Sequence, residues 1–268
     1  MLRFADPDIT GLLQSGDPHP VEWVNISGRS AIFLICEHAG RAVPSALGDL
    51  GIDPEEMDRH IAYDVGAEGL ARGLSERLDA PLILQRYSRL VIDCNRPYES
   101  DGCVVRQSDG TVVPANAEVA EIDRRRRFKE IHRPLHAAIA AALDDRQAGG
   151  GPLFLVTVHS FTPVMRATGA RRDFELGLLY NRDARLAERL ADLFARANPH
   201  VTVKLNEPYV VDDLSDYTIP VHGERRGIPH VLIETRNDLI TDDRGQREWA
   251  DRLAASLRLA AQSLEGSV

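Results

Sequence analysis

The sequence predicts a single α/β domain whose mostly parallel or mixed central sheet is flanked by helices on both faces. Short, nearly continuous apolar runs recur along the chain, and such runs are typical of strands that are buried on both faces of a sheet. Segments with helical periodicity alternate with these runs, which favours crossover connections between parallel strands. Because no long linker divides the chain, we expect one domain over residues 1–268, with 1–29 as an N-terminal arm or edge element.

The first half of the chain contains three expected strands. The apolar run AIFLIC at 31–36 ends at the turn-forming sequence EHAG, and the runs at 81–86 and 89–95 also end in polar residues. A helix is expected over 65–78, because leucines recur there at every fourth position and give the helix one apolar face.

The second half continues the alternation. One long helix or a broken pair is expected over 117–146, and the glycines at 149–151 end it. Apolar runs and helical segments then follow one another to the end of the chain. The expected strands are 153–160, 175–180, 201–206 and 230–237, and the expected helices are 183–197 and about 246–264.

The composition bears on partners and location. The 268 residues are 43% hydrophobic and carry a formal net charge of −9, so we expect a globular protein that binds neither nucleic acid nor membrane. The run Arg124 to Arg127 is expected to be a solvated helix face with acidic neighbours. We find no secretory signal, no apolar stretch of roughly 18 residues and no paired spacing among the three cysteines. These observations favour a cytoplasmic protein.

Polar residues that directly follow apolar runs are the candidates for chemistry, since ligands of such folds bind at the carboxyl ends of the strands. His38 and His159 end two expected strands, and Glu234 ends a third. Imidazole and carboxylate groups together suit Zn²⁺ with three protein ligands and an open position. Glu234 is the candidate general base, because a site between apolar residues and solvent raises a carboxyl pKa. A salt bridge to Arg236 or to another cation is the structural alternative for Glu234.

Other catalytic patterns are absent from the sequence. It has no G-x-S-x-G elbow, phosphate-binding loop or H-E-x-x-H motif. His132 and His136 are four residues apart on an expected helix, and we expect them to support the site from behind or to pack on the helix face. His60 and Asp64 share this spacing, and helix capping is the simple explanation for Asp64.

At these residues the chain resembles the N-formylglutamate amidohydrolase family. The S-R-x-V-I-D-x-N-R-P segment is the most specific match, and the ordered set covers roughly residues 30 to 240. The matching segments are EHAG at 37–40, DVGAEGL at 64–70, SRLVIDCNRP at 88–97, VHSF at 158–161 and IETR at 233–236.

The resemblance implies a fold similar to zinc-dependent carboxypeptidases and aspartoacylases, and a metal-activated water that hydrolyses an N-acyl amino-acid amide. Carried over by position, His38 and His159 would be metal ligands, and Glu234 would be the base and proton shuttle. The carboxypeptidase-like H-x-x-E is not kept, since Arg41 is the third residue after His38. Asp64 is therefore proposed as the third ligand, with Glu37 as the weaker option.

The resemblance also gives roles to further polar residues. Guanidinium groups bind carboxylates bidentately, so the arginines are candidates for a substrate such as N-formylglutamate. Arg96 ranks first because it lies past its expected strand. His222, in the loop before the Glu234 strand, is a candidate polar contact or oxyanion donor. The other candidate substrate-binding residues are Arg89, Asn95 and Arg236.

The leading hypothesis is a metal-dependent amidohydrolase, with Zn²⁺ as the expected cofactor and a small N-acyl amino acid as the expected partner. A zinc peptidase or amidase for peptide or cell-wall substrates is the first alternative. A metal-free binding protein on the same fold is the second. The approach to Glu234 differs from that of the best-known family members, which leaves the acyl group and the amino acid open. The oligomeric state is open too.

Overall fold

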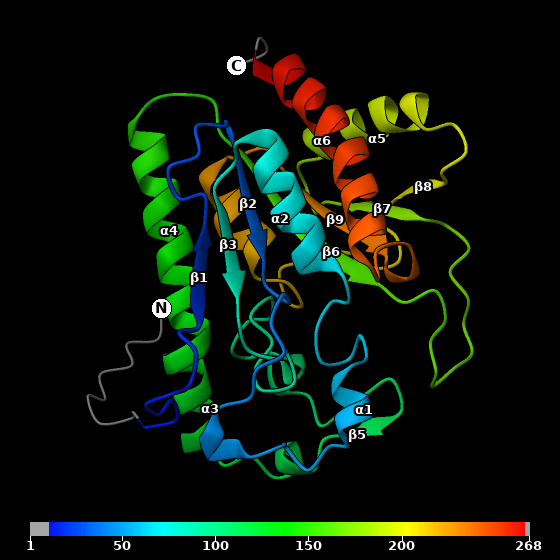
Figure 1. Ribbon diagram of the computed structural model, residues 1–268. Helices are drawn as coiled ribbons and strands as arrows, with labels where there is room; N and C mark the ends of the chain where they lie inside the picture. Colours follow the sequence, from blue (N-terminus) through cyan, green and yellow to red (C-terminus); the bar gives the residue numbers. More distant parts are fainter. Residues whose placement is uncertain (1–10, 266–268) are drawn as a thin grey trace.

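A seven-stranded mixed sheet forms the centre of the molecule, as Figure 1 shows. The structure is a computed structural model that describes residues 11–265. The sheet order is β1-β3-β2-β6-β9-β7-β8, in which β3, β2, β6 and β9 run parallel while β1 and β7 are antiparallel to their inner neighbours. The strands are β1 (Val21–Val24), β2 (Ile32–Cys36), β3 (Leu82–Gln85), β6 (Phe154–Phe161), β7 (Leu176–Leu179), β8 (Val203–Leu205) and β9 (His230–Arg236), and β4 (Gln107–Ser108) and β5 (Thr111–Val112) form a separate hairpin.

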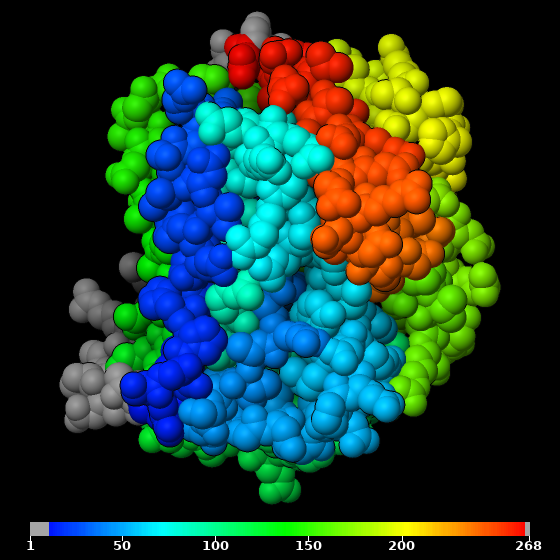
Figure 2. All heavy atoms as spheres, in the orientation of Figure 1, coloured from blue at the N-terminus to red at the C-terminus, as the bar shows by residue number. Residues whose placement is uncertain are grey.

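Helices cover both faces of this sheet, so the predicted α/β domain is confirmed. On one face, α2 (Ala67–Leu78), α5 (Arg185–Ala197) and α6 (Asp243–Glu265) pack on residues such as Leu34 and Val156 in one apolar core. Figure 2 shows the side chains of α2 and α6 meeting over this face. On the other face, α4 (Arg133–Ala148) packs on Phe33 and Ile35 in a second core. Successive side chains of β2 point to opposite faces of the sheet, so β2 contributes residues to both cores.

The two helices of the middle segment form the broken pair expected for 117–146. α3 (Glu121–Arg127) continues through a π-helical turn, η4 (Phe128–His132), into α4, which ends at Gly149 as predicted. The short helix α1 (Pro54–Met57) was not expected. α2 begins at Ala67, two residues later than predicted, because Gly66 has a φ of +79°. A Cβ there would lie 2.1 Å from the carbonyl oxygen of Ile240.

The strand expected over 89–95 is absent, and this prediction was wrong. Leu90, Val91 and Ile92 are fully buried in the second core, which explains the apolar run. Their backbone is satisfied by distant side chains instead of a neighbouring strand. The Asn116 Nδ2 donates to the carbonyl of Leu90 at 2.8 Å, and Arg127 Nη1 donates to that of Val91 at 2.9 Å. The sheet position beside β3 is taken by β1.

Arg127 also corrects the expectation for the arginine run. Arg125 and Arg126 form surface ion pairs with Glu121 and Asp123, as predicted, but Arg127 is only 2% exposed. The last of the four arginines is therefore part of the core rather than of a solvated face.

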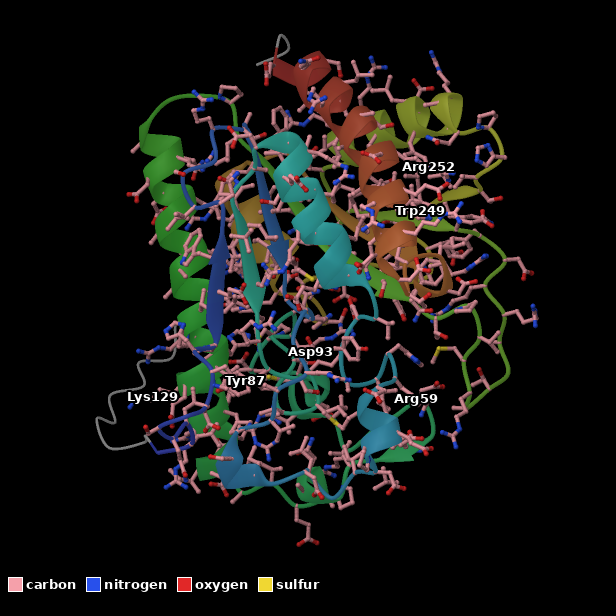
Figure 3. The ribbon with its side chains drawn as sticks, viewed as in Figure 1. Arg59, Tyr87, Asp93, Lys129, Trp249 and Arg252 are labelled. Atoms are coloured by element: carbon pink, nitrogen blue, oxygen red, sulfur yellow. The ribbon has the colours of Figure 1, made fainter. Side chains whose placement is uncertain are left out.

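The described part of the N-terminal arm lies along the edge of the domain. Glu130 accepts hydrogen bonds from the backbone N–H groups of Leu12 and Leu13, and Tyr87, labelled in Figure 3, donates to the carbonyl of Pro18. β1 then forms the predicted edge element. The first ten residues of the arm, and the last three of the chain, lie outside the described residues. None of the helices described has the length and apolar character that a membrane span requires.

Candidate active site

The carboxyl ends of β2, β6 and β9 bring the predicted histidines and glutamate together. His38 follows β2, and His159 and Glu234 are register partners on the neighbouring strands β6 and β9. Asp64 comes from the loop before α2 and is fixed to both histidine segments. Its N–H donates to the carbonyl of His38 at 2.9 Å, and its Oδ2 accepts from the N–H of Ser160 at 3.3 Å.

A glycine shapes the loop that carries His38. The N–H of Ala42 donates to the carbonyl of Arg86 at 3.1 Å, so the loop after β2 lies directly on the end of β3. A Cβ at Gly40 would lie 2.0 Å from the carbonyl carbon and oxygen of Arg86. Only glycine permits this close approach, which is the physical reason for the glycine of the EHAG segment.

Three potential ligand atoms converge at the centre of the site. The Nδ1 atoms of His38 and His159 are 3.2 Å apart, and Oδ2 of Asp64 lies 3.4 Å from the first and 2.8 Å from the second. A tetrahedral zinc site with bonds of about 2.0 Å has ligand atoms roughly 3.3 Å apart. All three residues are at most 3% exposed. The geometry, the burial and the donor atoms therefore fit Zn²⁺. His38, Asp64 and His159 are the three residues that were predicted as ligands.

The far side of each imidazole faces a buried carboxylate. The Nε2 of His38 lies 2.7 Å from Oδ1 of Asp93, and the Nε2 of His159 lies 3.1 Å from Oε2 of Glu37. A carboxylate in this position fixes the ring and directs the Nδ1 lone pair toward the centre. Glu37 thus lies behind a ligand and outside the group of converging atoms, which favours Asp64 over Glu37 as the third ligand.

The carboxylates are held in their charged form. Burial raises the pKa of Asp64, but His38 and His159 outweigh burial and hold it well below its usual range. Burial also raises the pKa of Asp93, but Arg89 and His38 have the larger effect and hold it well below its usual range. Burial acts on Glu37 in the same way, and the opposing effect of His159 brings its pKa to about 2. Arg89 links Asp93 to Asp64 and compensates both buried charges. The centre can therefore present an anionic ligand and two oriented imidazoles to a cation.

Glu234 differs from these carboxylates. Burial raises its pKa to about 7, as expected for a general base near neutral pH. Its Oε2 is buried and makes no hydrogen bond to the part of the chain that the structure describes. The alternative salt bridge to Arg236 does not form, since Arg236 pairs with Asp238 at 2.8 Å and Glu175 at 3.4 Å.

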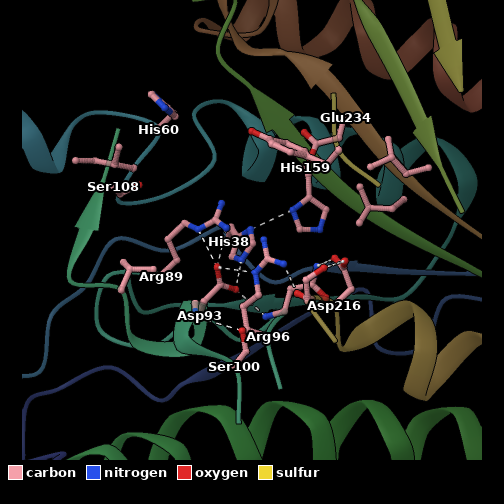
Figure 4. Close-up of a pocket in the computed structure, with 18 of the residues that line it drawn as sticks. His38, His60, Arg89, Asp93, Arg96, Ser100, Ser108, His159, Asp216 and Glu234 are labelled. Carbon is pink, nitrogen blue, oxygen red and sulfur yellow. Dashed lines mark hydrogen bonds and ion pairs between the residues drawn. The ribbon is translucent and has the colours of Figure 1, made fainter. Parts of the chain in front are cut away.

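The centre opens into a cleft of about 580 Å³, shown in Figure 4. This volume is in the range of small-molecule sites. His38, His159 and Glu234 lie along one side of the cleft, and His60 and Ser108 lie across Arg89 from them. Of the predicted site residues, the cleft is lined by His38, Arg89, Asn95, Arg96, His159 and Glu234, whereas Asp64, His222 and Arg236 do not line it.

The predicted substrate-binding residues differ in how far they already bond to other groups of the protein. Arg89 is held by Asp64 and Asp93. Asn95 is used within the protein, because its Nδ2 donates to Asp216 at 3.1 Å and its Oδ1 accepts from the N–H of Thr218 at 3.0 Å. Arg96 donates through Nη1 to the carbonyl of Ser215. Arg96 keeps more of its guanidinium available to a ligand than the others.

His222 lies in a buried stack of histidines. It lies in the π-helical turn η5 (Ile219–Gly223), and its Nε2 is 3.0 Å from Nδ1 of His136, whose Nε2 in turn bonds the carbonyl of Cys94 at 2.7 Å. His132 packs on His136 with ring centroids 4.4 Å apart. His132 and His136 thus pack behind the site, in line with the prediction, and His222 joins them there instead of facing the cleft.

One role was missed from the sequence, and one alternative explanation was wrong. Asp93, labelled in Figure 3 beyond the end of β3, orients His38, although it lies in the most specific of the matching segments. Asp64 does not cap α2, whose N-cap is Gly66 without a side-chain bond, so the capping explanation was wrong. Tyr209 and Asp216 line the cleft from a loop in which no sequence pattern marks them.

Comparisons with known proteins identify the family and the fold. The profile of the N-formylglutamate amidohydrolase family matches residues 30–241. A gene product of Agrobacterium tumefaciens, known from its crystal structure, is 35% identical, with a TM-score of 0.91 over 95% of this chain and 100% of that chain. An N-formylglutamate amidohydrolase from Ralstonia eutropha JMP134 is 21% identical, with a TM-score of 0.62 over 94% and 98% of the two chains, a likeness of fold.

No curated protein gives a significant match. The family match covers the ends of β2, β6 and β9 and the loops that carry Asp64 and Asp93. On these grounds the chain belongs to the N-formylglutamate amidohydrolase family.

Proposed function

We propose that the protein is a zinc-dependent amidohydrolase that cleaves the amide bond of a small N-formyl or N-acyl amino acid. The observation that carries the proposal is the placement of Glu234, which is the register partner of His159, lines the cleft and leaves Oε2 without a hydrogen bond to the described residues. A base with a raised pKa next to a His-Asp-His centre is the arrangement that hydrolysis of an amide needs. Membership of the family supports the same reaction class.

Different residues of the protein would have different roles in such a reaction. Zn²⁺ held by His38, Asp64 and His159 would lower the pKa of water and polarise the amide carbonyl. The Glu234 carboxylate accepts a proton from the attacking water and then delivers it to the leaving amide nitrogen. A pKa near 7 suits both steps, because the carboxyl gains and loses a proton at little cost. Arg96 is the candidate to hold a substrate carboxylate while this occurs.

The test combines metal analysis with a substrate panel. The purified protein is assayed for zinc by mass spectrometry and for hydrolysis of N-formyl and N-acetyl amino acids, before and after treatment with a chelator. We expect one zinc per chain, loss of hydrolysis with the chelator and recovery when zinc is added back. His38→Ala and His159→Ala should lose the metal, while the exposed His200→Ala keeps it.

Each alternative has its own outcome. Zinc binding by His38→Ala and His159→Ala at the wild-type level would overturn the metal site. A chain without metal or hydrolysis would be a binding protein on the same fold. Cleavage of peptides or cell-wall fragments, but not of N-acyl amino acids, would keep the metal chemistry and replace the substrate. A small-molecule partner remains our proposal, with neither nucleic acid nor membrane.

A further inference from the structure

The cleft offers one free guanidinium edge to an anion. All three nitrogens of Arg89 are engaged: Nε and Nη2 with Asp93 at 3.1 and 2.6 Å, and Nη1 with Asp64 at 3.2 Å. Arg96 uses Nη1 for the carbonyl of Ser215, and its Nε lies 4.0 Å from Asp93. Nη2 of Arg96 has no partner among the described residues. The two arginines together can therefore bind one further carboxylate, and Arg96 is where it binds.

The remaining charge of the cleft works against a second carboxylate. The side chains that line it include two arginines and no lysine, against four carboxyl groups. Asp93 lies 2.6 Å from Nη2 of Arg89, and Asp109 lies 2.8 Å from Nη2 of Arg59, so both carboxylates already face a guanidinium. A second carboxylate of the substrate would thus enter a site whose cations are already paired, and a buried, unpaired charge is costly.

An apolar wall lies beside the reacting centre. Leu232 is two residues before Glu234 on β9, so both side chains point to the same face of the sheet. Leu179 is the register partner of Leu232 on β7. Tyr209 and Val210 line the cleft from the loop after β8. The aliphatic side chains of this wall offer contact to an apolar group, and none of the four side chains carries a positive charge.

From these three observations we infer that the substrate carries a single carboxylate, bound by Arg96, and an apolar substituent that packs on the Leu179–Leu232 wall. N-formylglutamate, with its two carboxylates, is then a poor substrate of this protein. The inference rests on the proposed function and narrows it from any N-acyl amino acid to one of apolar character.

Competing substrates test the inference directly. The zinc-loaded protein is assayed with N-formylleucine, N-butyrylglycine and N-formylglutamate. We expect kcat/KM for at least one of the first two to exceed that for N-formylglutamate by about tenfold or more, because the second carboxylate is left unpaired. A higher kcat/KM for N-formylleucine than for N-butyrylglycine places the apolar group on the amino-acid side of the amide. A higher value for N-butyrylglycine places it on the acyl side.

The outcomes separate the inference from the proposed function. N-formylglutamate hydrolysed as fast as, or faster than, both apolar substrates overturns the inference and leaves the amidohydrolase proposal standing. No hydrolysis of any of the three overturns the inference, and no hydrolysis of any N-formyl or N-acetyl amino acid of the wider panel overturns the proposed function as well.

A charge added to the wall gives a second test. Val210 lines the cleft and is 67% exposed, so Val210→Arg should fold and supply the missing cation. We expect it to raise kcat/KM for N-formylglutamate relative to N-formylleucine by about tenfold. Val112, 59% exposed and outside the cleft, provides the matched control Val112→Arg, which should leave the ratio unchanged. Equal ratios in the two variants would count against the wall as a specificity site.

Binding without turnover gives a third readout. Glu234→Gln, which lacks the base, is titrated by calorimetry with N-formylleucine and with N-formylglutamate. Tighter binding of N-formylleucine, by about tenfold, supports the inference independently of the rate of hydrolysis. Tighter binding of N-formylglutamate overturns it.

Discussion

Glu37 Oε2 lies 3.1 Å from Nε2 of His159, and the Glu37 side chain is completely buried. Among the described residues, the close contact with His159 has the largest effect in stabilising the buried Glu37 charge. His38 has the same relationship with Asp93 at 2.7 Å. Each imidazole of the candidate metal centre is thus held from behind by a carboxylate of its own.

The first prediction concerns this support. Glu37→Gln keeps the shape of the side chain but removes its charge, so the ring of His159 is held less firmly and is a weaker base. We expect the zinc dissociation constant, measured by chelator competition, to rise by about 10- to 100-fold. Glu76→Gln, on the exposed surface of α2, is the control and should bind zinc as wild type does. An unchanged zinc affinity in Glu37→Gln would remove the supporting role.

The second prediction separates the base from the metal site. Glu234→Gln cannot accept a proton, and Glu234 is not among the three converging ligand residues. We expect kcat to fall by roughly 10²- to 10⁴-fold while one zinc per chain is retained. Turnover and zinc content are measured on the same preparation. Near-wild-type turnover, or loss of the zinc, would contradict the assignment of Glu234 as the general base.

The third prediction concerns Arg96. Arg96→Lys keeps the charge but loses the planar edge that binds a carboxylate with two N–H groups. We expect KM for an N-acyl amino acid to rise by about tenfold with little change in kcat. The same substrate with its carboxylate converted to an amide should show a much smaller change. Arg196→Lys, on the surface of α5, is the matched control. Equal effects on the charged and neutral substrates would indicate a structural role for Arg96.

The metal centre could be predicted because its residues follow apolar runs. His38, His159 and Glu234 each come at the end of a strand, and the carboxyl ends of parallel strands meet at one edge of a sheet. Asp64 was predicted as a ligand only through the resemblance to the family, since the sequence around it suggests a helix cap. The order of the strands thus predicts the two histidine ligands and the base, but it does not predict Asp64.

The rest of the site depends on contacts that no local pattern records. The run at 89–95 is as apolar as a strand, but Asn116 and Arg127 satisfy its backbone, and its Asp93 turns toward His38. His222 looked like a loop residue, yet it packs in the protein interior against His136. Both cases are long-range pairings of polar groups, which sequence periodicity does not encode.

The fourth prediction tests the loop that carries His38. Gly40→Ala would place a methyl group 2.0 Å from the backbone of Arg86, so the loop must move away from β3. We expect the free energy of unfolding, measured with urea, to fall by about 1–3 kcal/mol, and zinc binding to weaken. Gly151→Ala is the matched control, since nothing lies within 4 Å of a Cβ at that position. Equal stability of the two variants would show that the close approach is not needed.

The fifth prediction concerns the buried histidine stack and pH. Burial lowers the pKa values of His132, His136 and His222 from 6.5 to about 4, 3 and 2. Below pH 6.5 the unfolded chain therefore binds protons that the folded chain does not, so stability is full above pH 6.5 and falls as the pH drops toward 4. We expect each histidine to lower the free energy of unfolding by about 1–2 kcal/mol at pH 5 relative to pH 8. In urea titrations at the two pH values, His136→Gln should show a smaller difference than wild type, whereas the exposed His200→Gln should match wild type. The same pH difference in His136→Gln and wild type would contradict a neutral, buried His136.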